Sequence, residues 1–317
     1  RGAGIDIADV ARACRNRPLF FVRHLMRQVA ELPVETVDID PDLLDSTIID
    51  ALRGRNTGHE IALQVWRAED IHTGPRTDEL WRSLAEMLAG RGYSVARGNR
   101  EQVLSVLLTN ESLIVGLNQR EDALVDWPGG RLSLAKRSEQ VSRSEFKLEE
   151  LFQVSHVPLP AKGAALDLGA SPGGWTRVLR RRGLHVWAVD PADLDPRIAA
   201  DRNVHHVRST AGAFLTDTSQ HFDLIVNDMR MAPTRSCGVM LNATRCLNPG
   251  ALAILTLKLS PRQPLQTVRN ALELLSRSYD IRFARQLYHN RNEVTVVAEL
   301  RDGTDQPGAR KRRGPSL

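Results

Sequence analysis

One stretch, residues 164–175 with the sequence AALDLGASPGGW, constrains the fold of this chain more than any other. Its apolar first half ends at Gly169, and two more glycines, Gly173 and Gly174, follow. This is typical of a buried parallel strand that ends in a loop, and residues 176–182 continue with a helical pattern. Strand, loop and helix form the first unit of a doubly wound sheet, which binds ligands at the carboxyl ends of its strands. An ordinary strand-to-helix connection can have the same glycines, so the stretch predicts a site without naming its ligand.

The pattern beyond residue 141 alternates between strands and helices. Seven runs read as strands: residues 164–170, 185–190, 204–209, 222–228, 251–259, 281–288 and 293–300. Such alternation predicts a single, largely parallel α/β sheet of the doubly wound class. Only four residues, 289–292, separate the last two strands. Because this is too short for a crossover helix, we expect an antiparallel pair there.

The first half of the chain predicts a smaller α+β region without a catalytic cluster. Residues 5–32 fit either two helices or a strand and a helix, and residues 77–90 form an amphipathic helix pattern. Residues 102–108 and 112–117 predict two strands joined by a turn. The scattered histidines are more often structural or solvated than ligands; they are His24, His59 and His72. We place a linker between residues 130 and 141.

The charge and the cysteine content limit which kinds of binding partner and which cellular compartment the chain suits. The chain has 317 residues, enough for two domains, and a formal net charge of +5 with many more arginines than lysines. This balance suits a partner that carries phosphates, although a merely soluble basic protein has it too. The three cysteines lack C-x-x-C spacing and indicate neither disulfides nor a zinc site. With no apolar run near the roughly 20 residues that cross a bilayer, we expect a soluble, cytoplasmic protein without a metal.

Charged residues at the ends of the predicted strands point to a nucleoside cofactor. Asp190 ends the second strand, roughly 20 residues beyond the glycine loop, where doubly wound folds bind the ribose hydroxyls of an adenosine ligand. The chain lacks G-x-G-x-x-G and G-x-x-x-x-G-K-[ST] spacing at this loop, which argues against a dinucleotide and ATP. S-adenosylmethionine is the remaining common choice, and Asp167, inside the first strand, is placed to balance its cationic end.

Two further charges, Asp228 and Lys258, stand near the ends of the fourth and fifth strands. Both should reach the same carboxyl edge of the sheet, beside the cofactor. A structural ion pair is one interpretation of them. Because burying charges costs several kcal/mol unless the geometry compensates, a functional pair is the better one.

Several motifs together resemble one enzyme family. They are residues 142–148 (SRSEFKL), 167–175 (DLGASPGGW), 228–229 (DM), 257–259 (LKL) and 293–296 (EVTV). In this order they are similar to the motifs of FtsJ-type ribose 2′-O-methyltransferases. The run ARQLYH at 284–289, followed by Arg291 and EVTV, resembles the RlmM branch, the large-subunit ribosomal RNA cytidine 2′-O-methyltransferases. The likeness is strong over residues 141–300 and faint before them, where that family carries a THUMP RNA-binding domain.

The resemblance implies an S-adenosylmethionine-dependent enzyme with a catalytic tetrad, which here would be Lys147, Asp228, Lys258 and Glu293. A ribose hydroxyl is a poor nucleophile, and a lysine with a depressed pKa can act as its base or stabilise the alkoxide. We assign this role to Lys258 and expect Asp228 to orient it. Lys147 and Glu293 would position the hydroxyl and share protons within the coupled group.

The resemblance also implies the binding residues. Those for the cofactor would be Asp167, Gly169, Ser171, Pro172, Gly173, Gly174, Trp175, Asp190 and Asp228. RNA would be contacted by Arg143, Arg230 and Arg291, each of which could equally be an ordinary surface residue. The third strand ends in residues 208–210 (RST), where relatives place an acid near the adenine, so the adenine contacts stay open. The family's first strand–helix unit is expected to be missing before Arg1.

We therefore predict four regions: a helical or ferredoxin-like remnant (1–55), a THUMP-like RNA-binding domain (56–135), a Rossmann-like methyltransferase domain (141–300) and a disordered basic tail (301–317). The predicted function is methyl transfer from S-adenosylmethionine to a ribose 2′-hydroxyl of RNA, with 23S ribosomal RNA cytidine as the expected target. A monomer is the favoured state. The alternative is a non-catalytic RNA-binding or ribosome-assembly factor. An amino-group methyltransferase does not fit, because residues 227–230 read NDMR and not [ND]-P-P-[YF].

Overall fold

The structure of the protein is a computed structural model. Its chain divides into two units, Arg1–Ser133 and Leu134–Leu317. The structure describes residue 4 and residues 6–16, 19–34, 41–53, 60–68, 75–132, 134, 138–155 and 157–301. His59, His72 and residues 302–317 of the predicted tail lie outside the described residues. Each unit has a sheet of its own, and the boundary between the units falls inside the predicted linker.

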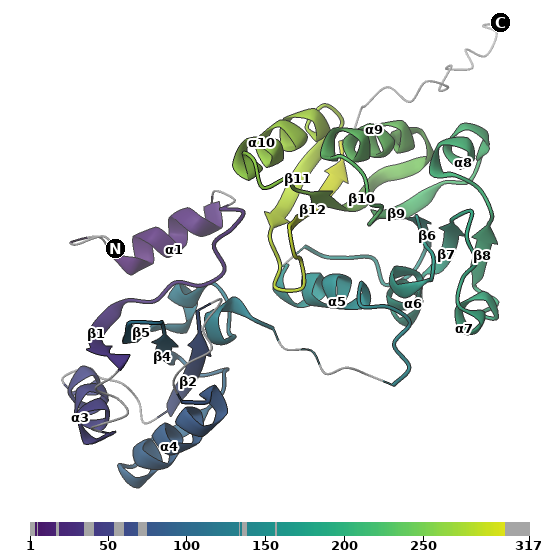
Figure 1. The fold of residues 1–317 in the computed structure, drawn as a ribbon. Coiled ribbons are helices and arrows are strands. Elements are labelled where there is room, and N and C mark those ends of the chain that lie inside the picture. Colours follow the sequence, from purple (N-terminus) through teal and green to yellow (C-terminus); the bar gives the residue numbers. More distant parts are fainter. Residues whose placement is uncertain are drawn as a thin grey trace, which may run out of the picture. The chain divides into compact units, whose positions relative to one another are not determined.

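The first unit is a five-stranded sheet covered by helices (Figure 1). Its strands are β1 (Gln28–Pro33), β2 (Glu60–Arg67), β3 (Ser94–Ala96), β4 (Gln102–Leu108) and β5 (Ser112–Gln119). Its helices are α1 (Ile7–Asn16), α3 (Pro41–Leu52) and α4 (Thr77–Gly90), followed by the short 3-10 turns η1 (Arg120–Ala123) and η2 (Pro128–Gly130). Of the two interpretations of residues 5–32, the helix and strand pair is confirmed.

The sheet of this unit has the order β1-β5-β4-β2-β3 and mixes directions. Strand β5 runs antiparallel to β1 and β4, whereas β2 runs parallel to β4 and β3. Strand β1 and helix α3 precede residue 55 and the other strands follow it. Residues on both sides of position 55 therefore build one sheet, although the sequence patterns assign them to two regions. The THUMP-like character of this unit stays a prediction.

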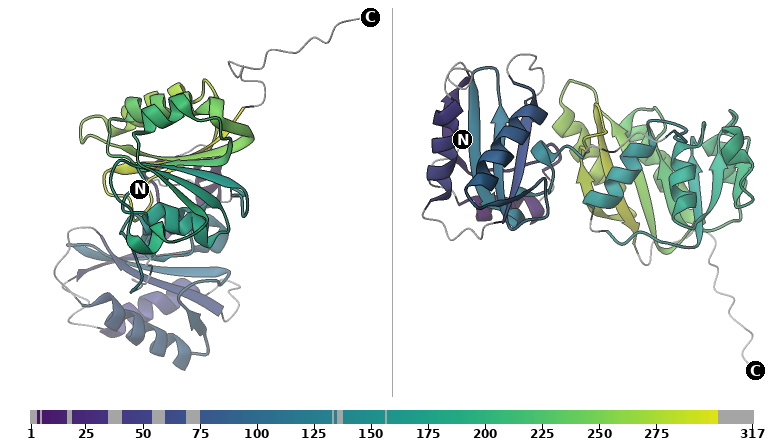
Figure 2. Two further views of the ribbon diagram at one scale, coloured as in Figure 1. Left: turned by 90° about the vertical axis from the view of Figure 1, so that its right-hand side faces the viewer. Right: turned by 90° about the horizontal axis from the view of Figure 1, so that it is seen from below.

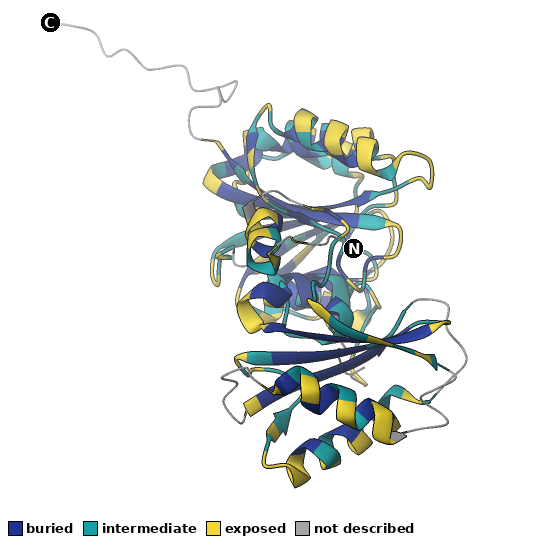
Figure 3. Cartoon of the chain, turned by 90° about the vertical axis from the view of Figure 1, so that its left-hand side faces the viewer, coloured by how far each residue is buried: buried dark blue, intermediate teal, exposed yellow. Residues whose placement is uncertain are grey.

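The core of the first unit explains the amphipathic pattern of residues 77–90. Leu80, Leu84 and Leu88 recur every four residues on α4 and are buried against the sheet together with residues of α3. Figure 3 shows both helices buried on their inner side and exposed on the outer one. Each fully buried leucine stabilises the fold by about 2 kcal/mol relative to an exposed one.

The second unit contains all seven predicted strands. They are β6 (Ala164–Leu168), β7 (His185–Val189), β8 (Val204–Val207), β9 (Phe222–Asn227), β10 (Leu247–Lys258), β11 (Tyr279–Arg285) and β12 (Glu293–Leu300). Its helices are α5 (Glu145–Val154), α6 (Gly174–Arg181), α7 (Pro196–Ala199), α8 (Ala211–Asp217), α9 (Pro233–Ala243) and α10 (Pro264–Leu275), with the 3-10 turn η3 (Thr244–Cys246). The strand predictions are confirmed, with small shifts at their ends.

The seven strands form one doubly wound sheet in the order β11-β12-β10-β9-β6-β7-β8. Strands β8, β7, β6, β9 and β10 are parallel, and β12 is antiparallel to both β10 and β11, which confirms the predicted antiparallel strand. Helices α8, α9 and α10 lie on one face and α5, α6 and α7 on the other (Figures 1 and 2). The chain leaves β6 toward β8 and then resumes at β9 on the opposite side of β6. A switch of this kind marks the ligand site of such sheets.

Two further features bear on the sequence predictions. Cys14, Cys237 and Cys246 are buried, and they form no disulfide with one another. Within the described ranges, none of the helices has the length and apolar character needed to span a bilayer.

Candidate active site

The glycine loop between β6 and α6 lies at the switch point between β6 and β9. Gly169 has φ +75° and Gly173 has φ +111°, conformations that residues with a side chain rarely adopt. A Cβ atom at Gly169 would lie 2.3 Å from Cγ of Met229, which follows β9. At Gly174 it would lie 2.0 Å from Oγ of Ser142, which precedes α5. The loop therefore packs too closely on its neighbours to accept larger residues at these glycines. Without side chains at these positions, its backbone can approach a ligand closely.

Asp190 follows β7 and is tied to this loop. Its Oδ2 accepts a hydrogen bond from the backbone N–H of Ser171 at 3.1 Å, and its Oδ1 accepts from Ala192 N at 2.8 Å. A carboxylate can accept about four hydrogen bonds, so two further positions suit a pair of ribose hydroxyls. Asp190 thus lies where the sequence predicts it and fits the adenosine half of the cofactor.

Asp167 in β6 is the buried acid of the site. Its residue is 2% exposed, and Thr176 Oγ1 donates a hydrogen bond to its Oδ2 at 2.6 Å. Burial raises the pKa of this carboxyl to about 7, and the Thr176 hydrogen bond opposes the rise. A cation beside Asp167 would favour the ionised form, so the residue fits a positively charged ligand group.

Three other residues of the glycine loop and the start of α6, Ser171, Pro172 and Trp175, make hydrogen bonds to neighbouring parts of the protein. Ser171 Oγ donates to the carbonyl oxygen of Asp193 at 2.8 Å, and the Pro172 carbonyl accepts from Asp195 N at 2.9 Å. Trp175 is 3% exposed, belongs to the hydrophobic core and donates from Nε1 to the carbonyl of Ser144 at 2.8 Å. The Trp175 side chain therefore braces α6 against the start of α5. Its contact with the cofactor stays a prediction.

The four predicted tetrad residues, far apart in the sequence, meet at the carboxyl edge of the sheet. Lys147 lies in α5, Asp228 follows β9, Lys258 ends β10 and Glu293 begins β12. Lys147 Nζ lies 3.2 Å from both carboxylate oxygens of Asp228 and 2.6 Å from Glu293 Oε2. Lys258 Nζ lies 2.5 Å from Asp228 Oδ1 and 2.9 Å from Glu293 Oε1. Each lysine thus contacts both carboxylates, and the four groups form a closed ring of alternating charge.

The antiparallel strand explains how two of these groups meet. Lys258 and Glu293 are direct partners in the register of β10 and β12. Facing side chains across such a pair have Cβ atoms about 5 Å apart. An ion pair at this position follows directly from the strand pairing.

The ring is mostly withdrawn from solvent, with side-chain exposures between 15% and 20%. Burial lowers the pKa of the Lys147 ammonium, but the carboxylates of Asp228 and Glu293 outweigh burial, and the pKa is raised overall. Lys147 is therefore a cation at neutral pH. It stabilises negative charge within the ring.

Two residues that sequence reasoning missed support the ring. Thr256 Oγ1 donates to Asp228 Oδ1 at 2.5 Å and accepts from Lys258 Nζ at 2.7 Å. Asn290 Nδ2 donates to Glu293 Oε2 at 3.4 Å. The signal for Thr256 was its place two residues before Lys258, since alternate strand residues share a face.

The three predicted RNA-binding arginines, Arg143, Arg230 and Arg291, are all exposed. Arg143 lies in the segment that leads to Lys147, Arg230 follows Asp228 by two residues, and Arg291 precedes Glu293 by two. In the part of the chain that the structure describes, none of the three forms an ion pair. Their charges are available to an anionic partner on segments that carry tetrad residues.

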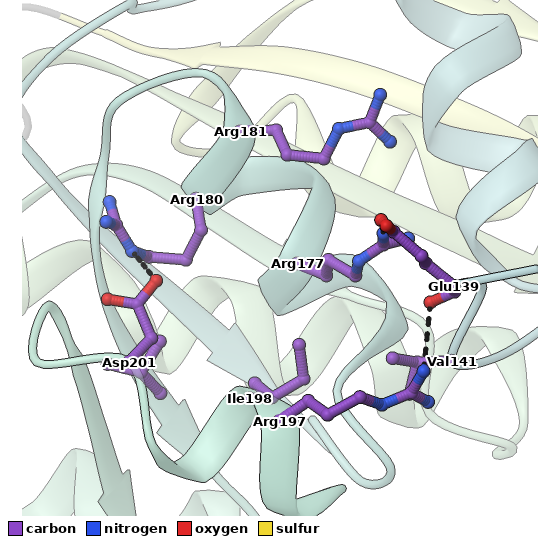
Figure 4. A pocket seen from close by; sticks show the side chains of 9 residues that line it. Glu139, Val141, Arg177, Arg180, Arg181, Arg197, Ile198 and Asp201 are labelled. Atoms are coloured by element: carbon purple, nitrogen blue, oxygen red, sulfur yellow. Dashed lines mark hydrogen bonds and ion pairs between the residues drawn. The ribbon is translucent and has the colours of Figure 1, made fainter.

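A cavity of about 420 Å³ beside α6 and α7 is a competing candidate (Figure 4). It is lined by Glu139, Val141, Arg177, Arg180, Arg181, Arg197, Ile198, Asp201 and Val204. Arg177 pairs with Glu139 and Glu145 at 2.9 Å, and the other three arginines each pair with a carboxylate as well. Neither the ring nor the glycine loop lines this cavity. Its charges are already balanced, so we interpret it as a structural ion-pair network.

Comparison with known proteins identifies the family. Residues 140–281 match the family described as FtsJ-like methyltransferase. The chain is 30% identical to the ribosomal RNA large subunit methyltransferase M of Aromatoleum aromaticum, over 94% of this chain and 82% of that protein. It is 36% identical to the protein of that name from Halorhodospira halophila, over 67% of this chain and 62% of that protein. This chain belongs to the ribosomal RNA large subunit methyltransferase M family. Membership confirms the predicted Rossmann-like methyltransferase fold, the enzyme class and the S-adenosylmethionine cofactor.

Solved structures resemble the chain only distantly. TrmN from Thermus thermophilus has a TM-score of 0.37 and 17% identity over 95% of this chain and 88% of its own. The fibrillarin pre-rRNA processing protein of Methanococcus jannaschii has a TM-score of 0.41 and 16% identity over 62% of this chain and 82% of its own. Conclusions about the site therefore depend on its own geometry.

Proposed function

We propose that this protein methylates a ribose 2′-hydroxyl of large-subunit ribosomal RNA, with a cytidine of 23S RNA as the target. The substrate class is supported by the names of its relatives, which are ribosomal RNA large subunit methyltransferases. The single observation that carries the reaction type is the closed ring of Lys147, Asp228, Lys258 and Glu293. A hydroxyl must lose its proton to accept a methyl group, and this ring combines proton acceptors with cations that stabilise an oxyanion. The complete ring favours an enzyme over the non-catalytic alternative.

The proposed division of work follows from the contacts. Lys258 Nζ either takes the proton of the 2′-hydroxyl or, as an ammonium, stabilises the alkoxide. Asp228 holds Lys258 in place, and Thr256 adds a further hydrogen bond to each of them. Lys147 remains protonated and, with Glu293, orients the hydroxyl. Positioning the oxygen in line with the methyl group supplies much of the remaining acceleration.

For the cofactor, we propose that Asp190 binds the ribose hydroxyls and Asp167 faces the cationic end. The loop from Gly169 to Gly174 would hold the part between them through its backbone. Bound there, S-adenosylmethionine supplies a methyl group that its sulfonium already activates.

For the RNA, we propose that Arg143, Arg230 and Arg291 contact phosphates around the target nucleotide. Exposed guanidinium groups that pair with no carboxylate among the described residues suit this role, because binding breaks none of the ion pairs described. The first unit would add a THUMP-like RNA-binding surface. Buried cysteines that form no disulfide with one another suit a reducing compartment, and we propose that the protein acts in the cytoplasm as a monomer.

The test combines a variant with RNA mapping. Lys258→Ala should lower methyl transfer to 23S RNA at least about 100-fold, the usual contribution of a general base. S-adenosylmethionine affinity measured by calorimetry should stay the same, because Lys258 is outside the proposed cofactor contacts. The control is Lys162→Ala, an exposed lysine in the same unit, which should behave as the wild type. Lys258→Arg separates the two roles, since arginine keeps the cation but cannot act as a base.

Mapping of 2′-O-methylation in ribosomal RNA from cells with and without the gene identifies the nucleotide. A methyl group that disappears with the gene and returns with the wild-type protein, but not with Lys258→Ala, is the expected result. Full transfer by Lys258→Ala would remove this lysine from the mechanism.

A further inference from the structure

A buried carboxylate outside the ring joins two of the elements that build it. Glu150 lies on α5, three residues after Lys147, and its side chain is 3% exposed. Its Oε1 accepts a hydrogen bond from Tyr288 N at 2.7 Å. Its Oε2 accepts from the backbone N of His289 at 2.8 Å and lies 2.7 Å from His289 Nδ1. An ionised carboxylate only accepts hydrogen bonds, so Nδ1 carries the hydrogen and donates it.

The segment that Glu150 contacts connects β11 to β12 and ends at Glu293. Asn290 braces it, because its Oδ1 accepts hydrogen bonds from Leu287 N within the segment and from Thr295 Oγ1 of β12, both at 2.9 Å. Asn290 also donates to Glu293, as described above. These hydrogen bonds connect the segment to Glu293, and Glu150 connects the same segment to α5.

Aromatic packing adds to this attachment. The ring of His289 lies against Phe146 of α5, with ring centroids 5.0 Å apart. Phe146 directly precedes Lys147 in the helix. His289 thus touches α5 on both sides of Lys147 in the sequence, through Phe146 and through Glu150.

We propose that Glu150 and His289 are positioning residues that hold Lys147 and Glu293 together in the catalytic ring. This inference rests on the proposed function. A buried carboxylate costs several kcal/mol unless its partners compensate, and three donors from one short segment provide that compensation. Lys147 and Glu293 lie 146 positions apart in the chain, on a helix and a strand that do not pair. Beside their own ion pair, Glu150 adds a second attachment between α5 and the segment that leads to Glu293.

The proposal predicts an effect on turnover and not on binding. Glu150 and His289 are outside the proposed cofactor contacts and the proposed RNA-binding arginines. Misplacing a reacting group by about 1 Å can cost about 100-fold in rate. Glu150→Gln should therefore lower kcat about 30- to 100-fold, with the KM for RNA and the Kd for S-adenosylmethionine within about threefold of wild type.

Two further variants make the kinetic test specific. His289→Ala removes one of three donors but keeps both backbone hydrogen bonds to Glu150, so it should fold even if Glu150→Gln does not. Its kcat should fall about tenfold. The matched control is Glu149→Gln, the neighbouring residue on α5, whose carboxylate pairs with Arg181 of α6. It should keep wild-type kcat and KM.

A second readout needs neither RNA nor turnover. The chain has only five lysines, at positions 136, 147, 162, 258 and 311, so NMR of lysine labelled at Cε gives few signals, and Lys147→Arg assigns one. Among the described residues, Lys147 contacts the carboxylates of Asp228 and Glu293, and the ammonium of Lys258 shares both carboxylates with it. Release of Glu293 should shift the Lys147 titration to lower pH in Glu150→Gln and His289→Ala, because burial then acts against fewer carboxylates.

The outcomes separate the possible failures. An unchanged Lys147 titration with wild-type kcat in His289→Ala would overturn the positioning role. A fall in kcat that merely matches the loss of folded protein, measured by circular dichroism, would overturn it as well. If the wild type transfers no methyl group to RNA, the proposed function fails, while the Lys147 titration still decides whether Glu150 and His289 hold the ring.

Discussion

Replacing Asp167 by asparagine changes the charge of the buried carboxyl in β6 with little change in shape. Burial raises the pKa of this carboxyl from its ordinary value of 3.8 to about 7. Asparagine never ionises and so resembles the protonated acid, and its amide oxygen can still accept from Thr176. We expect the variant to be more stable than the wild type without cofactor, and the difference to grow with pH.

The magnitude follows from the two pKa values. Below about pH 4 the carboxyl is protonated in both the folded and the unfolded chain. Between about pH 4 and 7 the unfolded chain releases this proton and the folded chain keeps it, so the free energy of unfolding falls as pH rises. One pKa unit corresponds to about 1.4 kcal/mol, so the full loss is about 4 kcal/mol, of which about 3 kcal/mol falls between pH 5 and pH 8.

Urea denaturation of both proteins at pH 5, 6, 7 and 8 measures this difference. Because the two proteins share every other titratable group, their difference isolates Asp167. The free energy of unfolding of Asp167→Asn should exceed that of the wild type by a difference that grows by about 3 kcal/mol from pH 5 to pH 8. A margin that stays constant with pH would show that Asp167 titrates like an ordinary carboxyl and would refute the reasoning.

Although Asp167→Asn should be more stable than the wild type, we expect it to bind S-adenosylmethionine more weakly. If Asp167 faces the cationic end of S-adenosylmethionine, the variant loses an ion pair in a buried site. Its Kd at pH 8, measured by calorimetry, should rise at least about tenfold, as expected when a buried charge loses its partner. Equal affinities at pH 8 would place the cationic end elsewhere.

Two other predictions concern the ring and the RNA. Thr256→Val keeps the β-branched shape that suits β10 but removes both hydrogen bonds to Asp228 and Lys258, so kcat should fall about tenfold with little change in melting temperature; wild-type kcat would make the hydroxyl dispensable. Arg291→Gln should weaken RNA binding and reduce the slope of log affinity against log salt by about 1, as for one lost phosphate contact; an unchanged slope in a binding assay would exclude such a contact.

Local sequence signals predicted much of the second unit. Gly169 and Gly173 indicated the loop after the first strand of this unit. Both have a left-handed backbone conformation that is costly for other residues. Apolar runs bounded by turn residues marked the seven strands, and a four-residue gap marked the antiparallel one. Charges at the ends of apolar strands marked Asp228 and Lys258. Resemblance to a family then added Lys147 and Glu293, which periodicity could not, since a lone Lys147 in a helix has no distinctive pattern.

In the first unit the sequence was less informative. The helix and strand of residues 5–32 had two interpretations, and pairing of β1 with β5 decided between them. That pairing joins segments about 85 residues apart, and such distant contacts depend on the packing of the whole core and not on local propensity.

The sequence by itself determined the doubly wound sheet, its glycine loop and the chemical groups at the carboxyl edge. These follow from short-range effects: strand alternation, glycine backbone freedom and the cost of burying charge. Only the tertiary structure decided that β12 lies between β10 and β11, which puts Glu293 opposite Lys258, and that Glu150 reaches the segment before Glu293. Register and side-chain contacts between distant segments arise from the packing of the complete fold, which no local pattern encodes.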